Sequence, residues 1–143
     1  MIFPDANLLL YAQDSLSKHH YTARRWWDDV LSGSDPVILS WPVINAFIRI
    51  ATNPRLHERP LTTEESIEIV ESWIAQPCVR IASPTENHWH LFQEQLKKSG
   101  ATGNLISDAH LATLAIEHGC TLYSSDQDFA KFPGLHWKNP FAH

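Results

Sequence analysis

The chain has 143 residues, 43% of them hydrophobic, and a formal net charge of −5 at pH 7. This length and apolar content are typical of a globular fold, so we expect a single domain over residues 1–143. The acidic balance argues against a general nucleic-acid-binding protein with a basic footprint. It leaves open an enzyme that holds phosphates at local basic patches.

The sequence contains no apolar run of 18 residues, so we expect no transmembrane helix. The first residues lack the basic and apolar regions of a signal peptide, and a cytoplasmic protein is expected. The two cysteines, Cys78 and Cys120, form no C-x-x-C motif. We therefore expect buried free thiols rather than a disulfide or a metal site.

The first half of the chain predicts strands at residues 2–4 and 37–40. Helices are expected at residues 6–11, 19–31 and 41–52. Pro42 suits the first turn of the last of these helices, because N–H groups there have no partner within the helix. Trp26 and Trp27 are neighbours on one helix, so the sequence predicts that one faces the core. The other lies on a partner surface or is partly buried within the monomer.

The second half predicts a helix over 62–75, where Thr62 and Glu65 have the spacing of a capping box. A strand at 79–81, helices at 84–99 and 105–118, and a strand at 121–123 follow. A short edge strand is expected at 136–137. Strands and helices alternate throughout, which is typical of an α/β fold with a parallel sheet.

Four acids lie where strands end or a helix begins. Asp5 follows the first strand, Asp108 opens a helix, and Asp126 and Asp128 follow the strand at 121–123. Because the carboxyl ends of parallel strands meet at one edge of a sheet, we expect these side chains to converge. Carboxylates that converge repel one another unless a cation or protons compensate them. Their hard oxygen ligands suit Mg²⁺ or Mn²⁺.

Each acid also has a simpler local explanation. Asp5 is placed to cap a helix, Asp126 to stabilise a turn, and Asn104 to cap the helix whose dipole Asp108 complements. The joint placement favours a metal site, because caps need no convergence. Nine histidines are present without zinc-ligand spacing, so surface or capping histidines are expected.

Several segments in order carry a family resemblance. They are residues 4–11 (PDANLLLY), 41–42 (WP) with 47–49 (FIR) and 52–55 (TNPR), 102–104 (TGN) with 108–112 (DAHLA), and 125–129 (SDQDF) with 132–135 (FPGL). Together they resemble the PIN-domain family, and more narrowly the VapC-type toxins of bacterial toxin–antitoxin pairs. The resemblance runs essentially from end to end of the chain.

The resemblance implies a three-layer α/β/α fold with a central, mostly parallel sheet of four to five strands. It implies a Mg²⁺-dependent endoribonuclease, with Mn²⁺ as a possible substitute, in which Asp5, Asp108 and Asp126 are the catalytic metal ligands. Asp128 is a looser match. Cleavage of RNA by metal-activated water would leave a 5′-phosphate and a 3′-hydroxyl. The implied partners are a cognate VapB-type antitoxin, whose tail covers the acidic groove, and a second copy in a homodimer, with no membrane.

One position departs from the family pattern. Many members carry a Glu where this chain has Ala46, and no acid occurs between Asp35 and Glu58. Asn45, Asn53 or Asp128 are candidate substitutes, and a weaker second metal site is expected. The alternative function is a catalytically weakened PIN-fold module that binds RNA or protein. A phosphatase ranks last, because no second carboxylate lies two residues after Asp5.

Overall fold

The computed structural model describes residues 1–142 and is built around one five-stranded sheet in the order β3-β2-β1-β4-β5. All four strand pairs are parallel. The strands are β1 (Ile2–Pro4), β2 (Val37–Ser40), β3 (Val79–Ala82), β4 (Thr121–Tyr123) and β5 (His136–Lys138). The expected edge strand at residues 136–137 is therefore present as β5 and pairs with β4.

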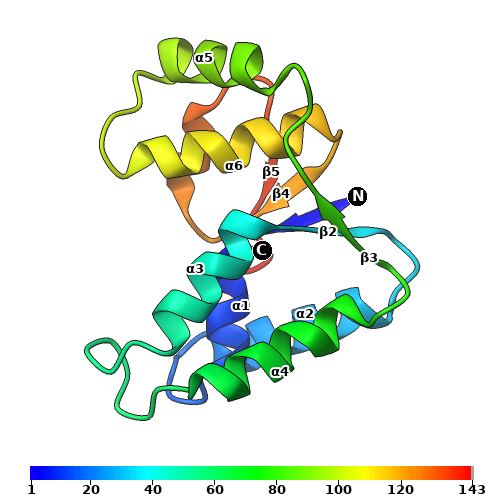
Figure 1. Ribbon diagram of the computed structural model, residues 1–143, viewed down its shortest axis with the longest axis vertical. Coiled ribbons are helices and arrows are strands. Elements are labelled where there is room, and N and C mark those ends of the chain that lie inside the picture. Colours follow the sequence, from blue (N-terminus) through cyan, green and yellow to red (C-terminus); the bar gives the residue numbers. More distant parts are fainter. Residues whose placement is uncertain (143) are drawn as a thin grey trace.

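Helices cover both faces of the sheet (Figure 1). On one side lie α1 (Ala6–Gln13), α2 (His20–Ser32), α3 (Trp41–Ala51) and α4 (Thr63–Ile74), and on the other lie α5 (His88–Ser99) and α6 (Leu105–Glu117). A 3₁₀ helix, η1 (Gln127–Lys131), follows β4. This arrangement confirms the three-layer α/β/α fold expected from the sequence.

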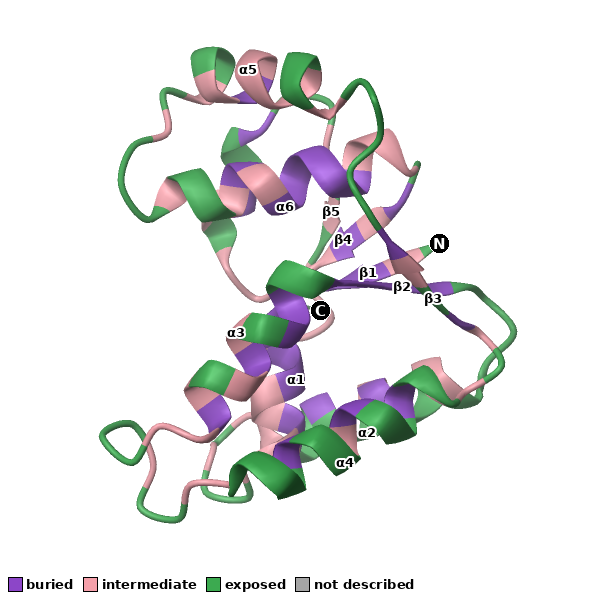
Figure 2. Ribbon diagram, viewed as in Figure 1, coloured by how far each residue is buried: buried purple, intermediate pink, exposed green. Residues whose placement is uncertain are grey.

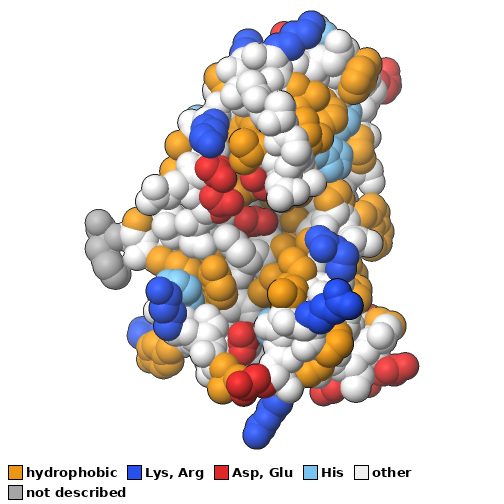
Figure 3. All heavy atoms as spheres, turned by 90° about the vertical axis from the view of Figure 1, so that its left-hand side faces the viewer, with side chains coloured by type: hydrophobic (Ala, Val, Ile, Leu, Met, Phe, Trp, Pro, Cys, Tyr) orange, Lys and Arg blue, Asp and Glu red, His pale blue; other side chains and the backbone are white. Residues whose placement is uncertain are grey.

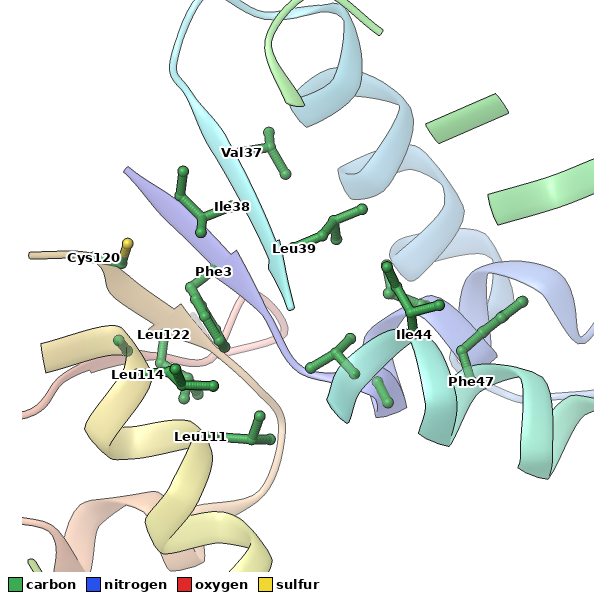
Figure 4. Close-up of a cluster of buried hydrophobic side chains, with 14 of the residues drawn as sticks. Phe3, Val37, Ile38, Leu39, Ile44, Phe47, Leu111, Leu114, Cys120 and Leu122 are labelled. Carbon is green, nitrogen blue, oxygen red and sulfur yellow. The ribbon is translucent and has the colours of Figure 1, made fainter. Parts of the chain in front are cut away.

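The core lies on both faces of the three inner strands. Phe3, Leu39 and Leu122 are fully buried, and they pack between Phe47 of α3 and Leu114 of α6 (Figure 4). Strands of a parallel sheet that helices cover on both faces read as continuous apolar runs, as β2 does. The helices turn their buried sides toward the sheet and one another (Figure 2).

The strand order reverses direction at β1. The chain passes from β1 to β2 and β3 along one side of the sheet, and β4 then returns to the other side of β1. The amide of Asp5 donates to the carbonyl of Tyr123 (2.9 Å), which joins the carboxyl ends of β1 and β4. In doubly wound folds, ligands bind in the crevice outside such a reversal point.

Local signals placed several helix ends correctly. Thr62 and Glu65 form the expected capping box, in which the Thr62 hydroxyl accepts from the Glu65 amide (3.1 Å) and the Glu65 carboxylate from the Thr62 amide (3.0 Å). Gly100 ends α5 in the left-handed conformation, with φ of 68°, which glycine adopts without a steric cost.

The expected helix over residues 84–99 is wrong at its start, because α5 begins at His88. Residues 86–87 form a turn instead, closed by the His88 amide on the Thr85 carbonyl (3.0 Å). The Thr85 hydroxyl and amide bind the carboxylate of Glu117 on α6. A contact between segments 32 residues apart thus replaces the first turn of the helix.

The two neighbouring tryptophans, Trp26 and Trp27, each contact a different aromatic residue inside the monomer. Trp27 is 1% exposed and meets Trp73 edge to face, with 5.6 Å between ring centroids. Trp26 is partly buried and packs on Tyr123 of β4, at 5.5 Å. These contacts favour partial burial within the monomer for Trp26. Cys120 is buried, Cys78 is partly buried, and both are free thiols.

Across residues 1–142, none of the helices combines the length and the apolar character that a membrane span needs.

The two tryptophans provide a test of the core. Trp27→Ala should lower the free energy of unfolding by about 3–5 kcal/mol, because it removes a fully buried indole and leaves a cavity. Trp26→Ala is the matched control and should cost clearly less, since its side chain is partly exposed. Urea denaturation followed by circular dichroism measures both. Equal losses would contradict this assignment of the core.

Candidate functional site

A groove of about 650 Å³ opens at the reversal point of the sheet. Its floor is formed by Asp5 and the start of α1, one wall by α3 and the other by α6 and Phe92 of α5. Asp126, from the turn after β4, reaches the same groove. The surface on this side of the molecule shows acidic side chains gathered in a hollow, with hydrophobic side chains beside them (Figure 3).

Asp5 is held by both of its carboxylate oxygens. Oδ1 accepts from the amide of Ala6 (2.7 Å), so Asp5 caps α1, and Oδ2 accepts from the hydroxyl of Ser124 (2.7 Å). Ser124 is fully buried at the end of β4. The side-chain amide of Asn7 donates to the hydroxyls of Ser124 (3.3 Å) and Ser125 (3.0 Å). These bonds fix the ends of β1 and β4 against each other.

The same serine positions the turn that carries the next two acids. The Asp126 amide donates to the Ser124 hydroxyl (3.0 Å), and Asp126 Oδ1 accepts from the amide of Asp128 (2.9 Å). Asp126 thereby caps η1, as the turn explanation expected. Its role in the turn does not remove it from the groove, because it also lines the groove wall.

Three carboxylates lie close enough to share one cation. Ligand oxygens of Asp108, Asp126 and Asp128 all lie within 4.8 Å of one another. Asp108 reaches this trio from the first turn of α6. Asp5 lines the same groove but is outside the trio, so its part in a ligand set stays a prediction. Asp128, expected to be a looser match, is in the cluster.

The fold raises the pKa of two of the groove's acids, Asp108 and Asp5. Burial and the carboxylates of Asp126, Asp5 and Asp128 raise the pKa of Asp108 to about 6, against the opposing effect of Lys131. Burial also raises the pKa of Asp5. The hydrogen bonds from Ser124 and Ala6 oppose that rise, and the charge of Asp126 adds to it. The acidic side of the groove, opposite Arg49 on α3, is therefore short of positive charge.

A divalent cation fits this donor set. Carboxylate oxygens are the hard ligands that Mg²⁺ and Mn²⁺ prefer, and a cation among them would relieve the repulsion that raises the pKa of Asp108. Within residues 1–142, the one ion pair to the cluster joins Lys131 Nζ to Asp128 Oδ1 (3.1 Å). Both of these side chains are about half exposed, so their attraction is weak.

Of the other residues singled out in the sequence, some line the groove and others lie outside it. Ala46 and the exposed Asn45 line the groove on α3. Asn53 does not line it; its side-chain oxygen accepts from the amide of Arg55 (2.9 Å) just beyond α3. Asn104 stands exposed at the start of α6, and its side chain makes no capping hydrogen bond, so the expected cap there is wrong.

Two histidines depart from the expectation of surface or capping residues. His88 Nδ1 lies 2.7 Å from Glu117 Oε1, and His88 Nε2 lies 3.1 Å from His110 Nδ1. His110 also lines the wall of the groove. Burial and the neighbouring His88 lower the pKa of His110. Burial of Glu117 works to raise its pKa, but hydrogen bonds from Thr85 and His88 outweigh burial and lower it.

Glu117, His88 and His110 thus form a row of hydrogen-bonded side chains. The sequence does not predict this row, because its three residues come from separate positions on α5 and α6. No role for Ser124 is predicted from the sequence. A hydroxyl at the end of a buried strand, directly before the acid-bearing turn, was the available clue to its larger role.

Comparison with known proteins bears on the whole chain. The sequence pattern of the PIN domain matches residues 2–135. Ribonuclease VapC37 of Mycobacterium tuberculosis is 43% identical over 138 residues, which cover 96% of each chain. Ribonuclease VapC33 of the same organism is 38% identical over 140 residues, covering 98% of each chain.

A solved structure agrees on the fold. The VapBC-1 complex of nontypeable Haemophilus influenzae contains a chain that superposes with a TM-score of 0.69 at 22% identity, covering 99% of this chain and 100% of that one. At this identity the likeness bears on the fold alone.

The raised pKa of Asp108 predicts the pH dependence of stability in metal-free protein. The pKa of Asp108 is about 6 in the folded protein, against a reference value of 3.8 that stands for the unfolded chain. Between these two pH values the folded state therefore binds more protons than the unfolded state. The contribution of Asp108 to stability should be greatest below the lower value and should be lost as pH rises through about 6. Because the side chain is half exposed, we expect a loss of about 1 kcal/mol.

Thermal unfolding in EDTA at fixed ionic strength measures this loss. Asp108→Asn should flatten the fall and raise the melting temperature at pH 7. Asp28→Asn, on the exposed surface of α2, is the control and should keep the wild-type profile. A profile for Asp108→Asn that matches wild type would show that the groove imposes no such repulsion.

Proposed function

Because the chain belongs to the PIN-domain family, we propose that it is a metal-dependent endoribonuclease and the toxin of a VapBC-type toxin–antitoxin pair. One observation carries the proposal: carboxylates from β1, α6 and the turn after β4 meet in one groove at the reversal point of the sheet. The relatives named VapC37 and VapC33 are ribonucleases and match nearly the full chain. They support a nuclease over other uses of such a site.

In the mechanism, Asp108, Asp126 and Asp128 would hold Mg²⁺, with Asp5 beside them. When bound, the metal lowers the pKa of a water molecule and stabilises negative charge on the scissile phosphate. Asp5 keeps its position through Ser124 and Ala6, and Asp126 through the amide of Asp128. These bonds hold the carboxylates in place before substrate binds, so little reorganisation is needed.

Arg49 supplies the positive charge that a phosphate needs at the groove. It lies on α3, one turn after Ala46, and is exposed on the groove wall. Contacts of this kind hold the RNA backbone and fix its register without selecting its sequence. We propose that hydrolysis leaves a 5′-phosphate and a 3′-hydroxyl.

The absence of Glu at position 46 shapes the metal stoichiometry. Ala46 leaves the α3 wall without a carboxylate, whereas Asp128 adds one to the cluster of Asp108 and Asp126. We propose one well-held metal and a weaker second one. The same alanine favours the second candidate function, a catalytically weakened module that binds RNA or protein.

The proposed partner is a VapB-type antitoxin. The Haemophilus neighbour is a VapBC complex, and a groove short of positive charge suits a basic segment. An arginine from such a segment would pair with Asp5, Asp108 or Asp126 and displace the metal. We also propose a homodimer, by analogy with the family.

The direct test incubates antitoxin-free protein with total bacterial RNA in Mg²⁺ or EDTA. Wild-type protein should give discrete fragments in Mg²⁺ alone. Asp108→Asn and Asp126→Asn should lower the rate by at least about 100-fold, because each removes a charge at the metal site. Sequencing of the fragment ends measures the products and checks for 5′-phosphates.

Asp29→Asn is the matched control, since Asp29 is exposed on α2 and does not line the groove. It should cleave as wild type does. Folded protein that leaves RNA intact in both Mg²⁺ and Mn²⁺ would contradict the nuclease and favour the binding module.

Ala46→Glu tests the metal stoichiometry. A carboxylate on the α3 wall should strengthen the second metal site and raise the cleavage rate at limiting Mg²⁺. Calorimetric titration with Mn²⁺ measures the number of sites, with Ala46→Gln as the control of equal size. Two tight sites already present in wild type would refute the weak second site.

A further inference from the structure

The wall of the groove formed by α5 and α6 carries a polar group that the acidic cluster does not use. His110 lies on α6, two residues beyond Asp108, and lines the groove together with Phe92 and Ile106. Its ring meets Phe92 edge to face, with 5.8 Å between centroids. A histidine ring fixed on this wall is placed to contact whatever the groove binds.

A row of hydrogen bonds fixes the orientation of that ring. Glu117 Oε1 lies 2.7 Å from His88 Nδ1, and His88 Nε2 lies 3.1 Å from His110 Nδ1. The Glu117 side chain is only 2% exposed, and the Thr85 hydroxyl donates to its other oxygen (2.7 Å). The two histidine rings stand nearly perpendicular, at 87°. The row is built and largely enclosed.

The chemistry of the row sets the direction of its hydrogen bonds. An ionised carboxylate only accepts, so His88 Nδ1 donates to Glu117. When both rings are neutral, each carries one N–H, so His88 Nε2 then accepts, and His110 Nδ1 donates to it. In that form the remaining nitrogen of His110, Nε2, is left as an acceptor, on a ring that lines the groove.

An acceptor at this place selects among the groups of a nucleic acid. Phosphate oxygens only accept and cannot pair with it. The ribose 2′-hydroxyl donates, is present at every RNA nucleotide, and is absent from DNA. We propose that His110 Nε2 accepts a hydrogen bond from a ribose 2′-hydroxyl in the groove, and that His88 and Glu117 are positioning residues that fix the required tautomer. This inference rests on the proposed nuclease function and adds a contact that prefers RNA over DNA.

The test compares binding of one mixed-sequence single-stranded RNA oligonucleotide with DNA of the same sequence. Protein carrying Asp126→Asn prevents cleavage, and fluorescence anisotropy measures both affinities. His110→Asn keeps a polar group near the position of Nδ1 but has no acceptor at the position of Nε2. It should therefore weaken RNA binding by about three- to tenfold and leave DNA binding unchanged. His110→Gln keeps an acceptor near Nε2 and should retain part of the preference.

Two further variants separate positioning from folding. His88→Phe preserves an aromatic ring beside Phe92 but breaks the row, and should reduce the RNA preference as His110→Asn does. His90→Asn, on the exposed side of the same helix, should have no effect. A general loss of structure would lower RNA and DNA binding together and would not change their ratio.

The outcomes distinguish this inference from the function on which it rests. Equal losses on RNA and DNA in His110→Asn protein with the wild-type circular dichroism spectrum would overturn it, and would assign His110 to a phosphate contact or to packing. An unchanged ratio in a protein that cleaves RNA in Mg²⁺ would also overturn it while leaving the nuclease intact. Absence of both cleavage and RNA binding in wild type would refute the nuclease itself.

Discussion

Repulsion among carboxylates at the reversal point of the sheet is the constraint around which this structure is organised. The order β3-β2-β1-β4-β5 places the ends of β1 and β4 side by side, so Asp5 and the turn bearing Asp126 must meet. The buried hydroxyl of Ser124 binds both segments and holds them there. Burial and the proximity of these carboxylates together raise the pKa of Asp108 to about 6.

Structural and functional roles coincide in these acids rather than compete. Asp5 caps α1 and Asp126 caps η1, as their local sequence contexts indicate. The same caps fix the carboxylates at one edge of the sheet, where their charges interact. A helix-capping explanation and a metal-site explanation were alternatives from the sequence, because sequence spacing alone does not show how close two strand ends lie. The fold makes them compatible.

The sequence predicted what depends on local pattern. The alternation of strands and helices, the capping box at Thr62 and the convergence of acids at strand ends follow from apolar periodicity and turn chemistry. The sequence-based prediction was wrong or silent where contacts between distant segments determine the local structure. Residues 84–87 leave the helix because Thr85 binds Glu117, and the row from Glu117 through His88 to His110 joins positions up to 29 residues apart. The inclusion of Asp128 in the acidic trio likewise depends on the turn at Ser124, not on spacing.

The central claim is that the acidic groove binds a divalent cation, and a crystal structure of the protein soaked in Mn²⁺ tests it most directly. Anomalous scattering locates the ion without reference to activity. The account predicts one strong peak among the oxygens of Asp108, Asp126 and Asp128, lost in Asp108→Asn crystals. An empty groove at millimolar Mn²⁺ and neutral pH, with the carboxylates in their present positions, would contradict it.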